Sequence, residues 1–323
     1  VMDLKQFSEQ ASAFAAQNES FIFIIDFELR NPLIYRLKEA FEHGIFYNIK
    51  GTANRKNSPH AIPVHIKPIP VDKNYYTDKF EKVVSFIKKG DSFLLNLTFP
   101  TEVEINLTLS EIFDLAVAPY KLLLEDEFVL FSPECFVRIS DDNIYTYPMK
   151  GTLEAHAEDA ENRLMNNEKE AWEHNTIVDL MRNDLSMVAT NVKVEKFRFI
   201  QKIRTHKGEI LQTSSEISGK LPTNWQFNLG EILLKLLPAG SVSGAPKQKT
   251  VEIIQNTEAM KRGYYCGIFG IYANGQLDSA VMIRYIEKKD GKMFFRSGGG
   301  ITARSNADEE YDELLNKIYV PTL

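Results

Sequence analysis

The chain has 323 residues, 44% of them hydrophobic, which is enough for a sizeable core in one large domain or two smaller ones. Its formal net charge of -6 and the lack of a basic stripe argue against nucleic acid as a partner. The two cysteines, Cys135 and Cys266, form neither a disulfide framework nor a zinc-binding spacing, and they fit a reducing cytoplasm. The longest apolar run near the start, residues 21–25, is too short to cross a membrane.

Hydrophobic periodicity and turn residues predict the elements in chain order. In the first half they are a helix over 4–16, a strand over 21–26, a helix over 33–43, a polar loop over 51–60, an extended run over 62–71, a helix over 76–89, and strands over 92–99, 128–131, 135–139 and 144–147. In the second half they are a long helix over 158–182, strands over 192–200, 209–217, 268–273, 277–285 and 292–297, and helices over 228–236, 246–256 and 307–319.

The order of these elements bears on the fold class. The strand runs alternate in hydrophobicity, and the pairs Asn274-Gly275 and Asp290-Gly291 are hairpin-turn signals. Both features favour antiparallel sheets with helices packed outside. A dinucleotide-binding βαβ fold is disfavoured because strands and helices do not alternate regularly.

Two pairs of glutamates share the same three-residue spacing. Glu170 and Glu173 lie in the predicted long helix, and Glu310 and Glu313 lie in the last helix. This spacing puts both members of a pair on one helical face. One such pair alone is most often a solvated surface, since charged residues are mostly exposed. Two pairs that converge would instead suit a hard cation such as Mg²⁺, which prefers oxygen ligands.

Two glycine-rich segments and one lysine are further candidates. Residues 238–247 (PAGSVSGAPK) and 297–301 (SGGGI) are able to present backbone N–H groups to an anion, although ordinary turns are the commoner use. Lys150 follows a predicted strand within the segment PMKGT. A lysine in a turn is usually solvated, whereas one held in a pocket can become a nucleophile.

Together these segments resemble the chorismate-utilising enzymes, a family that includes anthranilate, aminodeoxychorismate, isochorismate and salicylate synthases. The resemblance runs from about Tyr75 to Lys317, roughly three quarters of the chain. Its carriers appear in the family's order: SPE (132–134), PMKGT (148–152), EAWEH (170–174), VDLMRNDL (178–185), AGSVSGAPK (239–247), RGYYCG (262–267), Arg284, SGGGI (297–301) and EEYDELLNK (309–317). The resemblance implies an α+β fold in which two large antiparallel β-sheets pack as a sandwich with helices outside.

Two positions separate the members of the family. Aminodeoxychorismate synthases carry lysine where this chain has Lys150, whereas anthranilate synthases carry alanine. Isochorismate and salicylate synthases place a water-activating lysine where this chain has Leu94, and leucine cannot act as a base. Amine-adding members usually carry glutamine there, so Leu94 is a departure. The chain is thus most similar to aminodeoxychorismate synthase component I. The alternatives are an anthranilate synthase large subunit and, in a different class, a non-catalytic chorismate-binding regulatory subunit.

The resemblance also implies a role for each matched residue. Lys150 would be the nucleophile and Glu134 the general acid. Mg²⁺ would be bound by Glu173 and Glu313, with Glu170 and Glu310 holding its waters. The chorismate-binding residues would be Ser241, Tyr265, Arg284, Lys317 and the backbone around Gly299 and Gly300.

The implied product is 4-amino-4-deoxychorismate, on the route to p-aminobenzoate and folate. A separate glutamine amidotransferase (glutaminase) subunit would supply ammonia. Residues 1–74 would form a shortened N-terminal part of the sandwich and residues 75–323 the chorismate-binding catalytic region, both within one structural domain. The expected location is the cytoplasm.

Overall fold

The computed structural model describes residues 2–56, 63–205 and 208–322, and the strands within them form two nine-stranded antiparallel sheets. This agrees with the predicted fold class. None of the helices in these ranges is long and apolar enough to cross a membrane.

The first sheet contains the first strand of the chain, β1, next to one of its edges. Its order is β11 (Met149–Glu154), β13 (Gly208–Lys220), β10 (Asn143–Thr146), β9 (Cys135–Ser140), β16 (Gln276–Val281), β15 (Ile268–Ala273), β1 (Phe21–Ile25) and β2 (Leu33–Arg36), with β12 (Thr190–Thr205) also paired to β13. All five residues of β1 are buried, because the strand lies between β15 and β2 and its rings contact Phe7 and Phe14 of α1.

The second sheet carries the glycine-rich strand. Its order is β14 (Gly244–Ala245), β6 (Leu94–Ile105), β18 (Lys292–Ile301), β17 (Tyr285–Lys289), β8 (Phe128–Ser132), β7 (Tyr120–Leu124), β3 (Ile45–Ile49) and β4 (Thr52–Ala53), with β5 (Ile66–Ile69) paired to β6. Side chains of both sheets, such as Ile25 and Leu97, belong to one buried cluster, so the core lies between the sheets.

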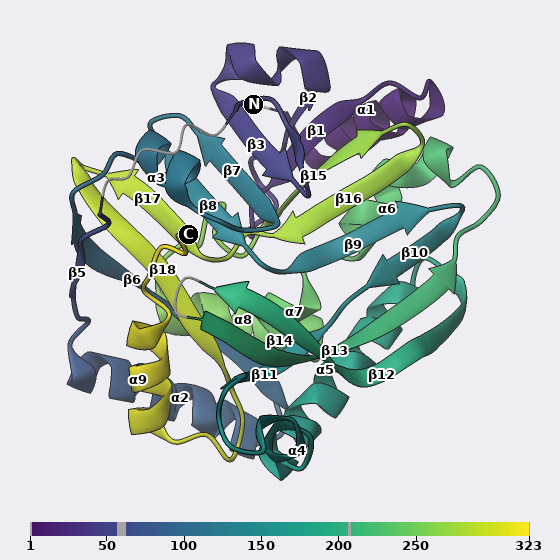
Figure 1. The fold of residues 1–323 in the computed structure, drawn as a ribbon. Coiled ribbons are helices and arrows are strands. Elements are labelled where there is room, and N and C mark those ends of the chain that lie inside the picture. Colours follow the sequence, from purple (N-terminus) through teal and green to yellow (C-terminus); the bar gives the residue numbers. More distant parts are fainter. Residues whose placement is uncertain (1, 57–62, 206–207, 323) are drawn as a thin grey trace.

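The helices cover the outside of the sheets (Figure 1). They are α1 (Leu4–Ala16), α2 (Lys73–Lys88), α3 (Leu109–Leu115), α4 (Ala160–Met165), α5 (Glu168–Ser186), α6 (Leu229–Lys235), α7 (Gly240–Ser243), α8 (Lys247–Glu258) and α9 (Ala307–Asn316). Helices α2, α8 and α9 pack by β6 and β18, whereas α5 packs on β11, β12 and β13. The cavity described below lies between α5 on one side and α9 with β18 on the other.

Several predicted elements need correction. Residues 33–43 are not one helix: the first four residues pair with β1 as β2, and Leu37–His43 form a 3-10 helix. The predicted long helix is divided into α4 and α5, because Asn167 caps a new helix by accepting a hydrogen bond from the Glu170 amide. Residues 277–285 are most of β16 and the first residue of β17, separated by residues 282–284, where Arg284 has a left-handed backbone.

Other elements were not predicted from the sequence. Strand β6 continues through Pro100 to Ile105, and β7, α3 and β11 were not expected. The predicted polar loop over 51–60 falls partly outside the described residues, while its residues Thr52–Ala53 form β4.

Candidate functional site

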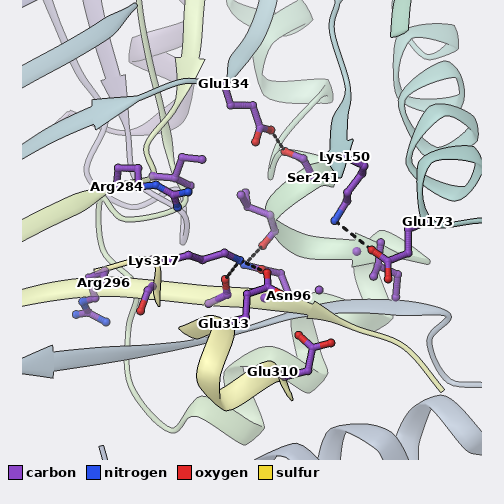
Figure 2. Close-up of a pocket in the computed structure, with 18 of the residues that line it drawn as sticks. Asn96, Glu134, Lys150, Glu173, Ser241, Arg284, Arg296, Glu310, Glu313 and Lys317 are labelled. Carbon is purple, nitrogen blue, oxygen red and sulfur yellow. Dashed lines mark hydrogen bonds and ion pairs between the residues drawn. The ribbon is translucent and has the colours of Figure 1, made fainter. Parts of the chain in front are cut away.

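A cavity of about 540 Å³ opens between the two sheets' edges and the helices α5 and α9. All twelve residues that the sequence singled out line it: Glu134, Lys150, Glu170, Glu173, Ser241, Tyr265, Arg284, Gly299, Gly300, Glu310, Glu313 and Lys317. They come from many separate elements, and Figure 2 shows Lys150 and Lys317 extending into the site from different sides.

Lys150 lies within strand β11 and not in the turn that the sequence suggested. Its carbonyl accepts a hydrogen bond from the Thr213 hydroxyl of β13, and the pairing with β13 is irregular between Lys150 and Thr152. At this bulge Gly151 has φ +70°. A bulge re-aims the flanking side chains, so it helps to direct Lys150 into the cavity.

Gly151 should tolerate no larger residue. A Cβ atom there would lie 3.0 Å from Glu170 Oε2 and 3.2 Å from Leu164 Cδ1, and its left-handed φ disfavours any residue with a Cβ. We expect Gly151→Ala to lower the free energy of unfolding by about 1–2 kcal/mol or more. Denaturant titration measures the change, with Gly275→Ala as the control, since Gly275 also has a positive φ but open space around it. Equal losses in both variants would show that the crowding against Glu170 is unimportant.

The first member of each glutamate pair, Glu170 or Glu310, lies in the first turn of its helix, and the second member lies one turn further along. Asn167 caps α5 just before Glu170, and Asn306 caps α9 by accepting hydrogen bonds from the amides of Asp308 and Glu309. Carboxylates are stabilised near a helix N-terminus, where backbone N–H groups carry partial positive charge. The local sequence therefore explains how Glu170 and Glu310 are held at the edge of one cavity, and the helical spacing puts Glu173 and Glu313 on the same faces.

Two lysines lie against these carboxylates. Lys150 Nζ is 4.0 Å from Glu173 Oε2, and Lys317 Nζ is 2.6 Å from Glu313 Oε1 while donating to the Gly298 carbonyl at 2.7 Å. Burial lowers the pKa of Lys317, and the Glu313 carboxylate partly opposes that shift. Each acid pair thus has one basic side chain beside it.

The carboxyl group of Glu134 differs from these acids in its surroundings. It accepts a hydrogen bond from the Ser241 hydroxyl of α7 (Figure 2). Burial raises the pKa of Glu134, and the Ser241 hydrogen bond with the charges of Lys150 and Arg284 only partly opposes that rise. A carboxyl group with a raised pKa is suited to donate a proton.

Another part of the cavity is suited to a substrate carboxylate. The Arg284 backbone is left-handed at φ +53°, and its guanidinium lies 5.4 Å from the centroid of the Tyr319 ring. Tyr265, on the wall of the same cavity, is buried, and burial holds the pKa of its hydroxyl well above the ordinary value. Tyr265 therefore remains a neutral hydrogen-bond donor, and it and the Arg284 guanidinium can both serve an anion in this cavity.

Further lining residues were not found from the sequence, among them Asn96, Arg296, Asn316 and Tyr319. Arg296 is buried, donates to Glu287 through Nε, and forms an ion pair with the same carboxylate through Nη2. The register between β17 and β18 brings these two residues together, so a diagonal cross-strand pair in the predicted hairpin was the one available signal.

His174 in EAWEH is a second feature that the sequence did not single out. It is fully buried on α5 and its Nε2 lies 2.6 Å from the Ser215 hydroxyl. Burial, with the charges of Arg198 and Lys150, lowers its pKa to about 4. His174 is therefore neutral at pH 7 and ties α5 to β13 behind Lys150.

The donor set was tested for a metal site. Over residues 2–56, 63–205 and 208–322, no three His, Cys, Asp or Glu side chains are grouped to hold an ion. Mg²⁺, however, usually keeps several waters and takes only one or two protein carboxylates. Two pairs of carboxylates that face one cavity meet that requirement.

Comparison with known proteins identifies the kind of enzyme that this site resembles. The model of the family described as chorismate binding enzyme matches residues 10–322. A curated relative from Haemophilus influenzae, named an uncharacterized PabA-like protein, is 56% identical over 98% of this chain and 97% of its own length. Aminodeoxychorismate synthase component 1 of Salmonella typhimurium is 31% identical over 75% of the chain, which spans 56% of that relative.

Two further comparisons concern other members. Anthranilate synthase component 1 of Bacillus subtilis is 33% identical over 76% of the chain and 50% of its own length, so overall identity does not separate the two activities. Among solved structures, the menaquinone-specific isochorismate synthase of Escherichia coli has a TM-score of 0.73 at 17% identity, covering 98% of this chain and 81% of that one. That likeness concerns the fold.

Proposed function

The chain belongs to the chorismate-binding enzymes, and from this premise we propose that it is the chorismate-binding subunit of an aminodeoxychorismate synthase. It would convert chorismate and ammonia into 4-amino-4-deoxychorismate in the cytoplasm, on the route to p-aminobenzoate and folate. The observation that carries the proposal is the placement of Lys150. Its amine lies inside the cavity, and the neighbouring position that would hold a water-activating base is Leu94.

The surroundings of Lys150 favour amine chemistry over water activation. A methyl group on Gly300 would lie 3.7 Å from Lys150 Nζ and 3.1 Å from Leu94 Cδ1, so the three residues share one corner of the cavity. Leu94 is buried and supplies no proton acceptor. Lys150 is therefore the group in this corner with a nucleophilic atom.

The proposed reaction proceeds in two displacements. The neutral Lys150 amine attacks C2 of chorismate, the two conjugated ring double bonds shift, and the 4-hydroxyl leaves as water with a proton from Glu134. Ammonia then attacks C4, the two double bonds return, and the Lys150 amine is expelled. The extra proton on the new amine returns to the Glu134 carboxylate. The net change replaces a hydroxyl by an amine and releases one water. Dividing one difficult displacement into two is the advantage of covalent catalysis.

Magnesium would complete the site for a substrate with two carboxylates. Glu173 and Glu313 would hold the ion, and Glu170 and Glu310 would hold its waters. When bound, Mg²⁺ would supply positive charge for the ring carboxylate. The cavity has five carboxylates and four basic side chains along its wall, so a dianionic substrate needs added positive charge.

The other carboxylate, on the enolpyruvyl group, would be recognised by Tyr265, Arg284, Lys317 and backbone amides of β18. In an antiparallel ladder, successive residues turn their amides alternately toward and away from the partner strand. The Gly298 carbonyl accepts a hydrogen bond from Lys317, so the backbone polar groups of Gly298 face away from β6. By the same alternation, the backbone polar groups of Gly300 also face away from β6. We infer that Gly298 and Gly300 present amides to the cavity, while Gly299 pairs with Leu97.

The pH dependence of turnover should report the proposed acid. Glu134 must be protonated to act, so activity is present below its raised pKa and is lost as pH rises through it. Ser241→Ala removes a hydrogen bond that stabilises the carboxylate, so it should raise that pKa further and move the alkaline limb to higher pH. The profile is measured with free ammonia held constant, and Ser85→Ala is the control because Ser85 donates to Lys82 on α2, outside the cavity. An unmoved limb in Ser241→Ala would argue against Glu134 as the acid.

Ammonia would come from a separate glutaminase subunit. The chain's two cysteines are both buried, and burial raises the pKa of each thiol to about 12, so neither resembles a glutaminase nucleophile. We expect the isolated chain to use ammonium at raised pH, where more of it is free ammonia, but not glutamine. Adding the partner should confer glutamine dependence. Release of glutamate from glutamine by the purified chain alone would contradict this arrangement.

The alternative within the family is an anthranilate synthase large subunit. Its product is aromatic and fluorescent, whereas aminodeoxychorismate is not aromatic. The test is to incubate the chain with chorismate, Mg²⁺ and ammonium while following chorismate consumption and fluorescence together. Consumption without anthranilate fluorescence supports the proposal. Fluorescence that accounts for the consumed chorismate would establish the alternative, and no consumption would favour a non-catalytic subunit.

A further inference from the structure

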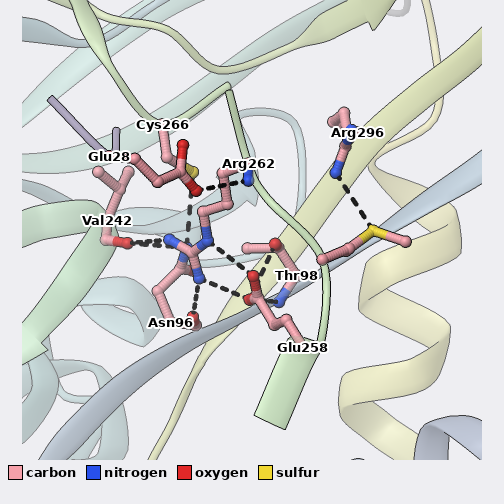
Figure 3. A network of polar contacts seen from close by, with 9 residues as sticks. Glu28, Asn96, Thr98, Val242, Glu258, Arg262, Cys266 and Arg296 are labelled. Carbon is pink, nitrogen blue, oxygen red and sulfur yellow. Dashed lines mark hydrogen bonds and ion pairs between the residues drawn. The ribbon is translucent and has the colours of Figure 1, made fainter. Parts of the chain in front are cut away.

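Behind the cavity lies a fully buried arginine that the proposed chemistry does not use. The Arg262 side chain is 1% exposed, and Glu258 neutralises it through two hydrogen bonds, at 2.9 Å from Nε and 2.6 Å from Nη2 (Figure 3). Burial of an ion pair is costly and often gives no net stability over apolar residues of similar size. The pair therefore calls for an explanation other than stability.

The remaining donors of Arg262 reach two segments that form the cavity wall. Nη1 donates to the Val242 carbonyl at 2.8 Å, and Nη2 donates to the Asn96 carbonyl at 2.6 Å. Both Val242 and Asn96 line the cavity. The Asn96 side chain also donates to the Val242 carbonyl at 3.2 Å, so strand β6 and helix α7 are joined at this point.

Glu258 extends the same connection along β6. Its Oε1 accepts from both the amide and the hydroxyl of Thr98, two residues beyond Asn96. On the other side, the Glu28 carboxylate accepts from the amides of Arg262 and Gly263, which holds the arginine's own backbone in place. The Arg262 backbone is thus held by Glu28 and its guanidinium by Glu258. The guanidinium can therefore keep β6 and α7 at a fixed separation.

We propose that Arg262 is a positioning residue that sets the place of α7 relative to β6, and thereby the place of Ser241 on the acid Glu134. Ser241 immediately precedes the anchored Val242 and donates to Glu134. Helix α7 has only four residues, so its own hydrogen bonds hold it weakly and an external anchor matters. The inference rests on the proposed function for the role of Glu134, but the anchoring itself does not.

The test is the paired variant Arg262→Met with Glu258→Gln. It leaves no lone buried charge, and the glutamine oxygen can still accept from Thr98, so folding should survive. We expect kcat for chorismate consumption to fall about tenfold to a hundredfold, with KM changing much less, because small misplacements of catalytic groups slow the reaction. Amide hydrogen exchange over residues 239–245 should become faster in the same variant, and this readout needs no turnover.

The matched control is Arg36→Met with Glu19→Gln, which removes a part-exposed Arg–Glu pair outside the cavity and should leave kcat unchanged. Because chorismate consumption is followed whatever the product, an error about aminodeoxychorismate would not affect the result. Wild-type kcat together with wild-type exchange over 239–245 would overturn the positioning role. Loss of thermal stability with unchanged exchange over that segment in the folded protein would also overturn it, since it would leave Arg262 a purely structural residue.

Discussion

Lys150→Ala is expected to reduce formation of aminodeoxychorismate at least about a thousandfold, because it removes the atom that would form the covalent intermediate. Chorismate binding should persist, since the residues proposed to bind its carboxylates lie on elements other than the strand that carries Lys150. Product formation by chromatography and binding by calorimetry measure the two effects separately. The combination of lost turnover and retained binding is the signature of a nucleophile.

Two controls strengthen this prediction. Lys150→Arg keeps the positive charge beside Glu173 but offers a poor nucleophile, so it should be as inactive as the alanine variant. Lys67→Ala removes an exposed lysine that also pairs with a glutamate, Glu104, and should behave as wild type. Turnover near the wild-type rate in Lys150→Ala would contradict the covalent mechanism.

Removal of one proposed metal ligand should have the second large effect. Glu173→Gln or Glu313→Gln takes away an anionic oxygen where Mg²⁺ would bind, so Mg²⁺ affinity and turnover should each fall by about a hundredfold or more. Calorimetry of Mg²⁺ binding, with chorismate present, gives a readout that does not depend on catalysis. Exhaustive chelation of the wild-type protein should abolish turnover.

The control for this substitution is Glu252→Gln on α8. Glu252 is exposed and pairs with Lys249 three residues away, so it matches the helical setting of Glu313 without facing the cavity. Full turnover after chelation would rule out the metal role. Unchanged Mg²⁺ affinity in both glutamine variants would show that the ion, if needed, binds elsewhere.

Much of the architecture was predictable from the sequence where local pattern and tertiary setting agree. Helix α1 spans the predicted residues 4–16, and its cap, Asp3, completes a capping box with Gln6. The prediction was wrong for residues 33–43, because pairing with β1 turned the first four into an edge strand in spite of their helical periodicity. The pairing partner lies outside the segment whose periodicity was read, so the pattern of residues 33–43 alone does not reveal it.

The candidate site, too, was predictable from the sequence only in part. Motif order identified twelve residues that the fold brings to one cavity. It did not indicate that Lys150 lies in a strand, because β11 faces the cavity and lacks the alternating apolar pattern of a half-buried strand. Nor did it indicate the Arg262–Glu258 pair, whose importance depends on carbonyls supplied by β6 and α7.

The most direct test of the central claim is mass spectrometry of the product formed from chorismate, Mg²⁺ and ammonium by the purified chain. The account predicts a compound that keeps both carboxylates and the enolpyruvyl group and carries one amine in place of a hydroxyl. Labelled ammonium should place its isotope in that compound. Formation of anthranilate with free pyruvate, or of an isomer of chorismate that contains no nitrogen, would contradict it.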